Sequence, residues 1–131
     1  MASRAADWFR QARQDLEHAR TSVAAGHHEW ACFAAHQAAE KALKALFQSL
    51  GGEARGHSLS GLLDHIAGRR PVEAALLDAG RQLDRHYIPA RYPNAYAEGA
   101  PCQYYARGDA EEAIADAEQI FQFCERQLAG S

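Results

Sequence analysis

The chain has 131 residues, of which 47% are hydrophobic, and a formal net charge of −3 at pH 7. This length suits one domain with a single hydrophobic core. No stretch approaches the ~18 apolar residues of a membrane-spanning helix, and Asp7 interrupts the start before the apolar run of a secretory signal can form. We therefore expect one domain over residues 1–131, without a membrane anchor and located in the cytoplasm.

The cysteines argue against two further classes of protein, and the charges give little support to a third. Cys32, Cys102 and Cys124 are odd in number and form no CxxC pair, which predicts reduced thiols instead of a disulfide framework or a zinc knuckle. Residues 69–107 hold six Lys/Arg against four Asp/Glu, whereas residues 108–131 hold one against six. A surplus of two cations is too small to indicate a nucleic-acid groove by itself.

The first two helices are predicted from apolar stripes at three- and four-residue steps. The first stripe ends at Gly26 and comprises Ala5, Trp8, Ala12, Leu16, Ala19 and Val23. The second helix is expected from about Trp30 to Leu50, before the pair Gly51-Gly52. Its apolar face carries Cys32, Ala35, Ala39, Leu43, Leu46, Phe47 and Leu50. Because alanines occupy its other faces, neighbouring helices can approach from several sides, and we expect this helix at the centre.

Ser58 is a predicted N-cap for a short third helix that carries Leu59, Leu62, Leu63 and Ile66 and ends near Gly68. Pro71 suits the first turn of a fourth helix, which Pro89 closes. The buried stripe of that helix is expected to be Val72, Leu76, Ala79, Leu83 and Tyr87.

An ordered loop without regular elements is predicted for residues 88–108, which carry three Pro, two Gly and four Tyr with no sustained period. Asp109 with Glu112 indicates an acidic capping box at the start of a fifth helix. No strand pattern appears. The predicted fold class is all-α, an up-and-down bundle of four long helices plus one short helix.

Four ordered sequence matches carry a resemblance to a known family. The stretch Trp30–Ala45 contains a QAAEKALKA core on a helix of small residues. Asp15-Leu16 with Ala19 precedes it, His57-Ser58-Leu59 follows, and Tyr87–Asn94 reads YIPARYPN. Together they resemble the HEPN family (higher-eukaryote and prokaryote nucleotide-binding domain), in the branch with an RYP-type loop.

The resemblance implies a helical domain that binds RNA or a nucleotide, forms a homodimer and is paired with a minimal nucleotidyltransferase, in a system of the toxin–antitoxin kind. No cofactor is implied. Catalytic members of the family are metal-independent endoribonucleases that carry Arg, four to six residues, and then His. Arg81 and His86 satisfy that spacing here, and they define the alternative function, an endoribonuclease toxin.

The chemistry expected of this pair is phosphodiester cleavage, with His86 as general acid and base and Arg81 as the phosphate stabiliser. The same spacing occurs at Arg13–His18 and Arg20–His27, so only position in the chain favours Arg81 and His86. A five-residue step separates two side chains by about 140° around a helix. One chain therefore does not bring the pair together unaided, whereas two protomers could.

Other basic residues are candidates for nucleotide or RNA binding. Arg85 and Arg91 lie in the cation-rich segment, and Arg91 beside Tyr92 can clamp a phosphate and stack a base. Arg91 can equally tie the loop to an acidic helix such as the last one. Lys41 and Lys44 share a helix face, where they either contact phosphate or pair with Glu40 or a partner subunit.

Two further expectations concern metal and assembly. No metal site is expected, because a bundle metal centre needs paired Glu-x-x-His motifs and the chain offers only Asp15-x-x-His18. A homodimer is expected through Trp30, Phe33 and the tyrosine-rich loop, because aromatic side chains are enriched at interfaces.

Overall fold

The structure, a computed structural model, describes residues 3–130, so Met1, Ala2 and Ser131 of the predicted domain lie outside the described residues. It is all-helical, as predicted. The helices are α1 (Ala5–Ala24), α2 (His28–Ser49), α3 (Leu59–Ala67), α4 (Ala74–Asp84), α5 (Pro101–Tyr104) and α6 (Arg107–Ala129), with a 3-10 turn at Pro93–Ala95. No helix within residues 3–130 has both the length and the apolar character needed to cross a membrane.

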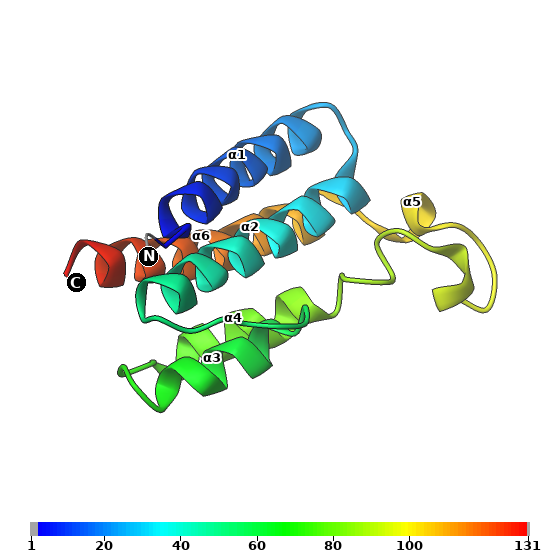
Figure 1. Cartoon of the computed structure of the whole chain (residues 1–131). Coiled ribbons are helices and arrows are strands. Elements are labelled where there is room, and N and C mark those ends of the chain that lie inside the picture. Colours follow the sequence, from blue (N-terminus) through cyan, green and yellow to red (C-terminus); the bar gives the residue numbers. More distant parts are fainter. Residues whose placement is uncertain (1–2, 131) are drawn as a thin grey trace.

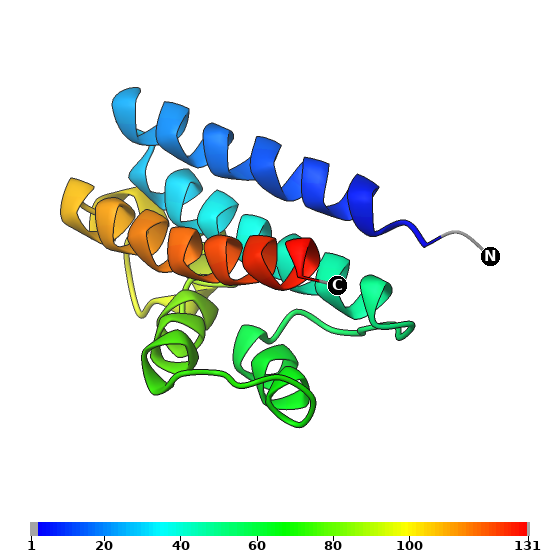
Figure 2. The same cartoon turned by 90° about the vertical axis from the view of Figure 1, so that its left-hand side faces the viewer.

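Helix α2 lies at the centre, as its alanines predict. It contacts α1, α3, α4, α5 and α6, and α1, α2 and α6 run alongside one another over the pair α3 and α4 (Figures 1 and 2). Its small buried side chains allow the close approach. Those with no exposed surface are Ala31, Ala35, Ala38, Ala39, Ala42 and Ala45.

The predicted start and stop signals hold for the first three helices. Gly26 follows α1 with φ +86° and Gly51 follows α2 with φ +81°, a conformation that glycine adopts without strain. The Ser58 hydroxyl accepts a hydrogen bond from the Gly61 amide at 3.1 Å, which caps α3. The second helix begins at His28, two residues before the predicted Trp30.

The fourth and last helices correct the predicted boundaries. Helix α4 begins at Ala74, three residues after Pro71, because Glu73 is extended (ψ 151°). It ends at Asp84, so Tyr87 lies in the following turns and not on the helical stripe. Helix α6 begins at Arg107, and Asp109 caps it from inside by accepting from the Ala106 amide at 2.8 Å. Asp109 therefore does not act as the predicted N-cap with Glu112.

Residues 88–106 form an arm, which we call the tyrosine arm, that projects beyond the start of α2 (Figure 1). It contains the 3-10 turn and α5, where the sequence predicts a loop without regular elements; each begins with a proline, whose φ suits a first helical position. The Tyr96 and Tyr104 rings stack at 4.2 Å, and the Tyr96 hydroxyl donates to the Pro89 carbonyl at 2.9 Å. These contacts order the arm internally.

The three cysteines are free thiols, as predicted. Cys102 is exposed on α5, whereas Cys32 and Cys124 are buried. Burial raises the pKa of the Cys32 thiol to about 12 and also raises the pKa of Cys124.

Candidate functional site

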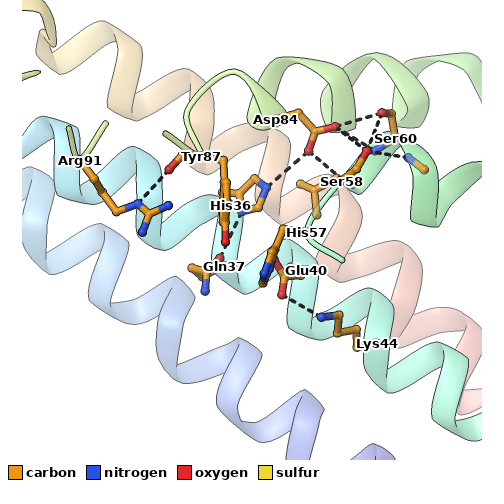
Figure 3. Close-up of polar contacts among 12 residues, drawn as sticks. His36, Gln37, Glu40, Lys44, His57, Ser58, Ser60, Asp84, Tyr87 and Arg91 are labelled. Carbon is orange, nitrogen blue, oxygen red and sulfur yellow. Dashed lines mark hydrogen bonds and ion pairs between the residues drawn. The ribbon is translucent and has the colours of Figure 1, made fainter. Parts of the chain in front are cut away.

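The matched sequence stretches meet in space on one side of α2 (Figure 3). His36 and Glu40 come from the QAAEK helix, His57 and Ser58 from the segment before α3, and Tyr87 and Arg91 from the segment after α4. Three segments that are far apart in the sequence thereby meet around a single tyrosine ring.

Asp84, the last residue of α4, fastens α3 to this cluster. Its carboxylate accepts hydrogen bonds from the Leu59 amide (2.7 Å), the Ser60 amide (3.1 Å) and the Ser60 hydroxyl (3.0 Å). The Nε2 atom of the fully buried His36 lies 3.4 Å from the same carboxylate. Burial pushes the pKa of Asp84 up, but the nearby His36 ring and the hydrogen bonds from Leu59 and Ser60 outweigh burial and hold the pKa below its ordinary value.

Tyr87 is the centre of the cluster. The His57 ring stacks on it with centroids 4.8 Å apart and 20° between planes, and the His36 ring lies 5.1 Å away. The Arg91 guanidinium carbon lies 4.7 Å from the centre of the Tyr87 ring. Because helix α4 ends at Asp84, the chain is free to turn and bring this ring against α2.

A buried carboxylate holds His57 in place. Glu40 Oε1 lies 2.9 Å from His57 Nδ1, and Glu40 Oε2 accepts from Lys44 Nζ at 3.1 Å. The Glu40 side chain is 5% exposed, whereas the His57 side chain is 52% exposed. Beside His57 lies an open groove of about 440 Å³, whose lining includes Phe47, Glu53, Arg55, His57 and His65.

Arg91 is anchored by aromatic rings and a carbonyl. Its Nε donates to the Tyr87 carbonyl oxygen at 2.8 Å. Its guanidinium carbon lies 4.2 Å from the centre of the Phe33 ring and 5.0 Å from that of Tyr92. Within residues 3–130 this arginine makes no ion pair, so the predicted tie to an acidic helix is not found there.

Arg81 and His86 do not meet within one chain. Arg81 is exposed and pairs with Asp78 at 3.2 Å. His86 is half-buried, and its Nδ1 lies 2.8 Å from the Tyr105 hydroxyl. Burial lowers the pKa of His86, His36 and Arg85 act in the same direction, and Asp109 opposes them, so the ring is a weaker base than an exposed histidine. The catalytic role of this pair stays a prediction that needs a second protomer.

The other predicted binding residues divide into two groups. Lys44 pairs with Glu40, and Lys41 Nζ lies 2.5 Å from Asp15 Oδ2, so both lysines are neutralised within the fold. Arg85 is exposed at the end of α4, and Tyr92 is 48% exposed beside Arg91. Arg91 and Tyr92 lie together, with the Arg91 guanidinium carbon 5.0 Å from the centre of the Tyr92 ring.

Sequence reasoning misses the residues that build the cluster, namely His36, Glu40, His57, Asp84 and Tyr87. Four of them lie inside the stretches that carry the family resemblance, which is the available signal. Asp84 lies between Arg81 and His86, so the Arg–His spacing points to the segment that supplies one residue of the cluster. Among the described residues, no three His, Cys, Asp or Glu side chains converge as metal ligands.

The chain matches known proteins along nearly its whole length. The model of the HEPN domain matches residues 5–127. A Methanocaldococcus jannaschii protein that bears the name "Putative toxin MJ1304" is 27% identical over 124 residues, which cover 88% of this chain and 82% of that protein.

Solved structures are similar to this chain both in fold and in sequence. Protein TT1696 of Thermus thermophilus is 44% identical, with a TM-score of 0.94 and coverage of 96% of this chain and 99% of its own. ST0689, an archaeal HEPN homologue, is 43% identical, with a TM-score of 0.81 and coverage of 97% of this chain and 98% of its own. A HEPN domain protein of Thermotoga maritima is 36% identical, with a TM-score of 0.78 and coverage of 94% of this chain and 98% of its own. The chain therefore belongs to the HEPN domain family.

Proposed function

We propose that this protein is an RNA- or nucleotide-binding module that acts as a homodimer. We also propose that it is paired with a minimal nucleotidyltransferase in a toxin–antitoxin-like system. Membership of the HEPN family supports the ligand class, and the relative named as a toxin supports the biological role. The pairing rests on the family resemblance alone.

The observation that carries the ligand proposal is the setting of Arg91. Aromatic rings and the Tyr87 carbonyl fix its guanidinium plane, yet its hydrogen bond to the carbonyl uses only Nε. The remaining N–H groups form the planar fork that suits a phosphate. Tyr92, 48% exposed, offers a ring face on which a base can stack. A pre-positioned arginine beside an exposed tyrosine is an arrangement typical of single-stranded RNA recognition.

The dimer proposal is supported by exposed apolar surface next to this site. Trp30 is 48% exposed, and its ring contacts Phe33 edge-on at 6.1 Å. Ile88, at the start of the tyrosine arm, is 44% exposed. Sedimentation at micromolar concentration should show a dimer, and a monomer alone would contradict this part of the proposal.

Replacing Arg91 by alanine is expected to weaken binding of a single-stranded RNA oligonucleotide about tenfold, equivalent to ~1.4 kcal/mol. The slope of log Kd against log salt should also become shallower, because one phosphate contact is lost. Fluorescence anisotropy titrations at several salt concentrations measure both quantities.

Arg13 provides the matched control. Its guanidinium carbon lies 5.2 Å from the centre of the Phe9 ring and 5.5 Å from that of Phe121, so Arg13→Ala loses similar ring contacts between α1 and α6. Both variants should lower the melting temperature slightly, and only Arg91→Ala should weaken binding. Unchanged RNA affinity in Arg91→Ala would refute the assignment of Arg91 as a ligand-binding residue.

A further inference from the structure

The groove beside α3 is separate from the pair Arg91 and Tyr92, neither of which lines it. Its walls are the connection between α2 and α3 and the first turns of α3, and its apolar lining consists of Phe47, Ala54 and Leu62. Its volume of about 440 Å³ lies in the range of small-molecule pockets. The groove is therefore large enough to hold a ligand of its own.

Two opposite charges line this groove. Glu53 and Arg55 are both exposed and two positions apart, and within residues 3–130 neither makes an ion pair. The Glu53 carboxylate attracts a cation, and the planar guanidinium fork of Arg55 suits a carboxylate. A ligand that carries one charge of each sign would satisfy both residues.

The floor of the groove suits an apolar and preferably aromatic group. Phe47 packs against the hydrophobic core, and its ring lies edge-on to the His65 ring with centroids 6.4 Å apart. A further ring can join such a pair in edge-on or offset geometry, which stabilises it beyond the burial of its area. The charged residues would hold one end of the ligand, and this floor would hold the other.

The wall at His57 is fixed in place by contacts on both sides of the ring (Figure 3). Its Nδ1 lies 2.9 Å from Glu40 Oε1, and the ring stacks on Tyr87. Burying the Glu40 carboxylate costs free energy that an apolar side chain of similar volume would avoid, so stability alone does not explain it. A wall that is already ordered lowers the entropy cost of binding a ligand.

We propose that this groove binds a free amino acid with an apolar, preferably aromatic, side chain. The α-carboxylate pairs with Arg55, the α-ammonium pairs with Glu53, and the side chain lies against Phe47 and Leu62. A nucleotide fits the groove less well, because its phosphates would place negative charge beside Glu53. The site is independent of the proposed RNA-binding function.

The test is an NMR titration of the isotope-labelled full chain with L-phenylalanine. We expect saturable binding with a Kd of about 1 mM or below, and shifts of amide signals within residues 53–65. Two analogues each lack one charge: 3-phenylpropanoate has no ammonium group, and 2-phenylethylamine has no carboxylate. Each should bind about tenfold more weakly than L-phenylalanine, because one charge-assisted contact is lost.

Two variants assign the charges to residues. Glu53→Gln should bind L-phenylalanine and 3-phenylpropanoate equally, because nothing remains to recognise the ammonium group. Arg55→Gln should bind L-phenylalanine and 2-phenylethylamine equally. This crossed pattern measures each contact as a double-mutant cycle does, and a general loss of structure would not produce it. Arg10→Gln and Glu112→Gln, at exposed positions outside the groove, should bind all three compounds like the wild type.

The outcomes separate this inference from the proposed function. No saturable binding of L-phenylalanine up to about 10 mM would overturn the inference, as would binding that both charge variants leave unchanged. If Arg55→Gln weakened RNA binding as strongly as Arg91→Ala, the groove would belong to the RNA surface, which also overturns the inference. A protein that binds L-phenylalanine with the crossed pattern but does not bind RNA would support the amino-acid site and refute the proposed function.

Discussion

Replacing Ala38 by leucine is expected to lower the free energy of unfolding by about 3 kcal/mol. Ala38 has no exposed surface, and it lies on α2, the helix that contacts all the other helices of the bundle. Leucine is nearly as good a helix former as alanine, so the loss would come from overpacking where helices approach closely. Urea unfolding monitored by circular dichroism measures it.

The control is the same substitution at an exposed alanine. Ala115 lies on the solvent side of α6, and Ala115→Leu should change the free energy of unfolding by less than about 0.5 kcal/mol. Equal effects of the two substitutions would show that the centre of the bundle is more loosely packed than the structure indicates.

Replacing Asp84 by alanine is expected to destabilise the fold by about 3 kcal/mol. The change removes the acceptor for the amides of Leu59 and Ser60, and Leu59 is fully buried, so water cannot replace the lost partner. The start of α3 should loosen first, and with it the wall of the groove. Asp64→Ala, at an exposed position on α3, serves as the control and should be nearly neutral.

The Asp84 carboxylate also makes the free energy of unfolding depend on pH, in a direction that follows from its lowered pKa. The folded protein binds the Asp84 proton less tightly than the unfolded chain, whose aspartates titrate near 3.8. The contribution of Asp84 to stability is therefore complete above about pH 5 and declines as the pH falls through the folded pKa. In Asp84→Asn this acid-side decline should be smaller than in the wild type. An identical decline in both proteins would show that other carboxyl groups account for it.

The helices are predictable from the sequence wherever one periodic stripe decides the outcome. The stripe from Ala12 to Val23 and the alanines of α2 predict the correct elements and the correct central helix. The predicted boundaries of α4 are wrong because tertiary contacts overrule periodicity there. Tyr87 fits the helical stripe in sequence, but its ring is better placed against His57 and Arg91, and the chain turns after Asp84 to reach them.

The site is predictable only in outline. Arg91 and Tyr92 lie together, as adjacent loop residues do whatever the fold, and their role in binding stays a prediction. Glu40 and His57 are 17 positions apart in the sequence, on either side of the α2–α3 connection. The periodic spacing of apolar residues does not predict a contact of this kind. The two lysines suggest a phosphate site because positive charge is visible in a sequence, whereas the carboxylates that neutralise it are visible only in three dimensions.

The position of Cys102 makes the tyrosine arm experimentally accessible. It is the exposed thiol of the three, while burial keeps Cys32 and Cys124 protonated and shielded. A maleimide dye should therefore attach at α5 without any engineered cysteine, because the thiolate is the reacting form. A fluorophore on the native chain would then report, in real time, when the arm meets a second subunit, a nucleotidyltransferase or a strand of RNA.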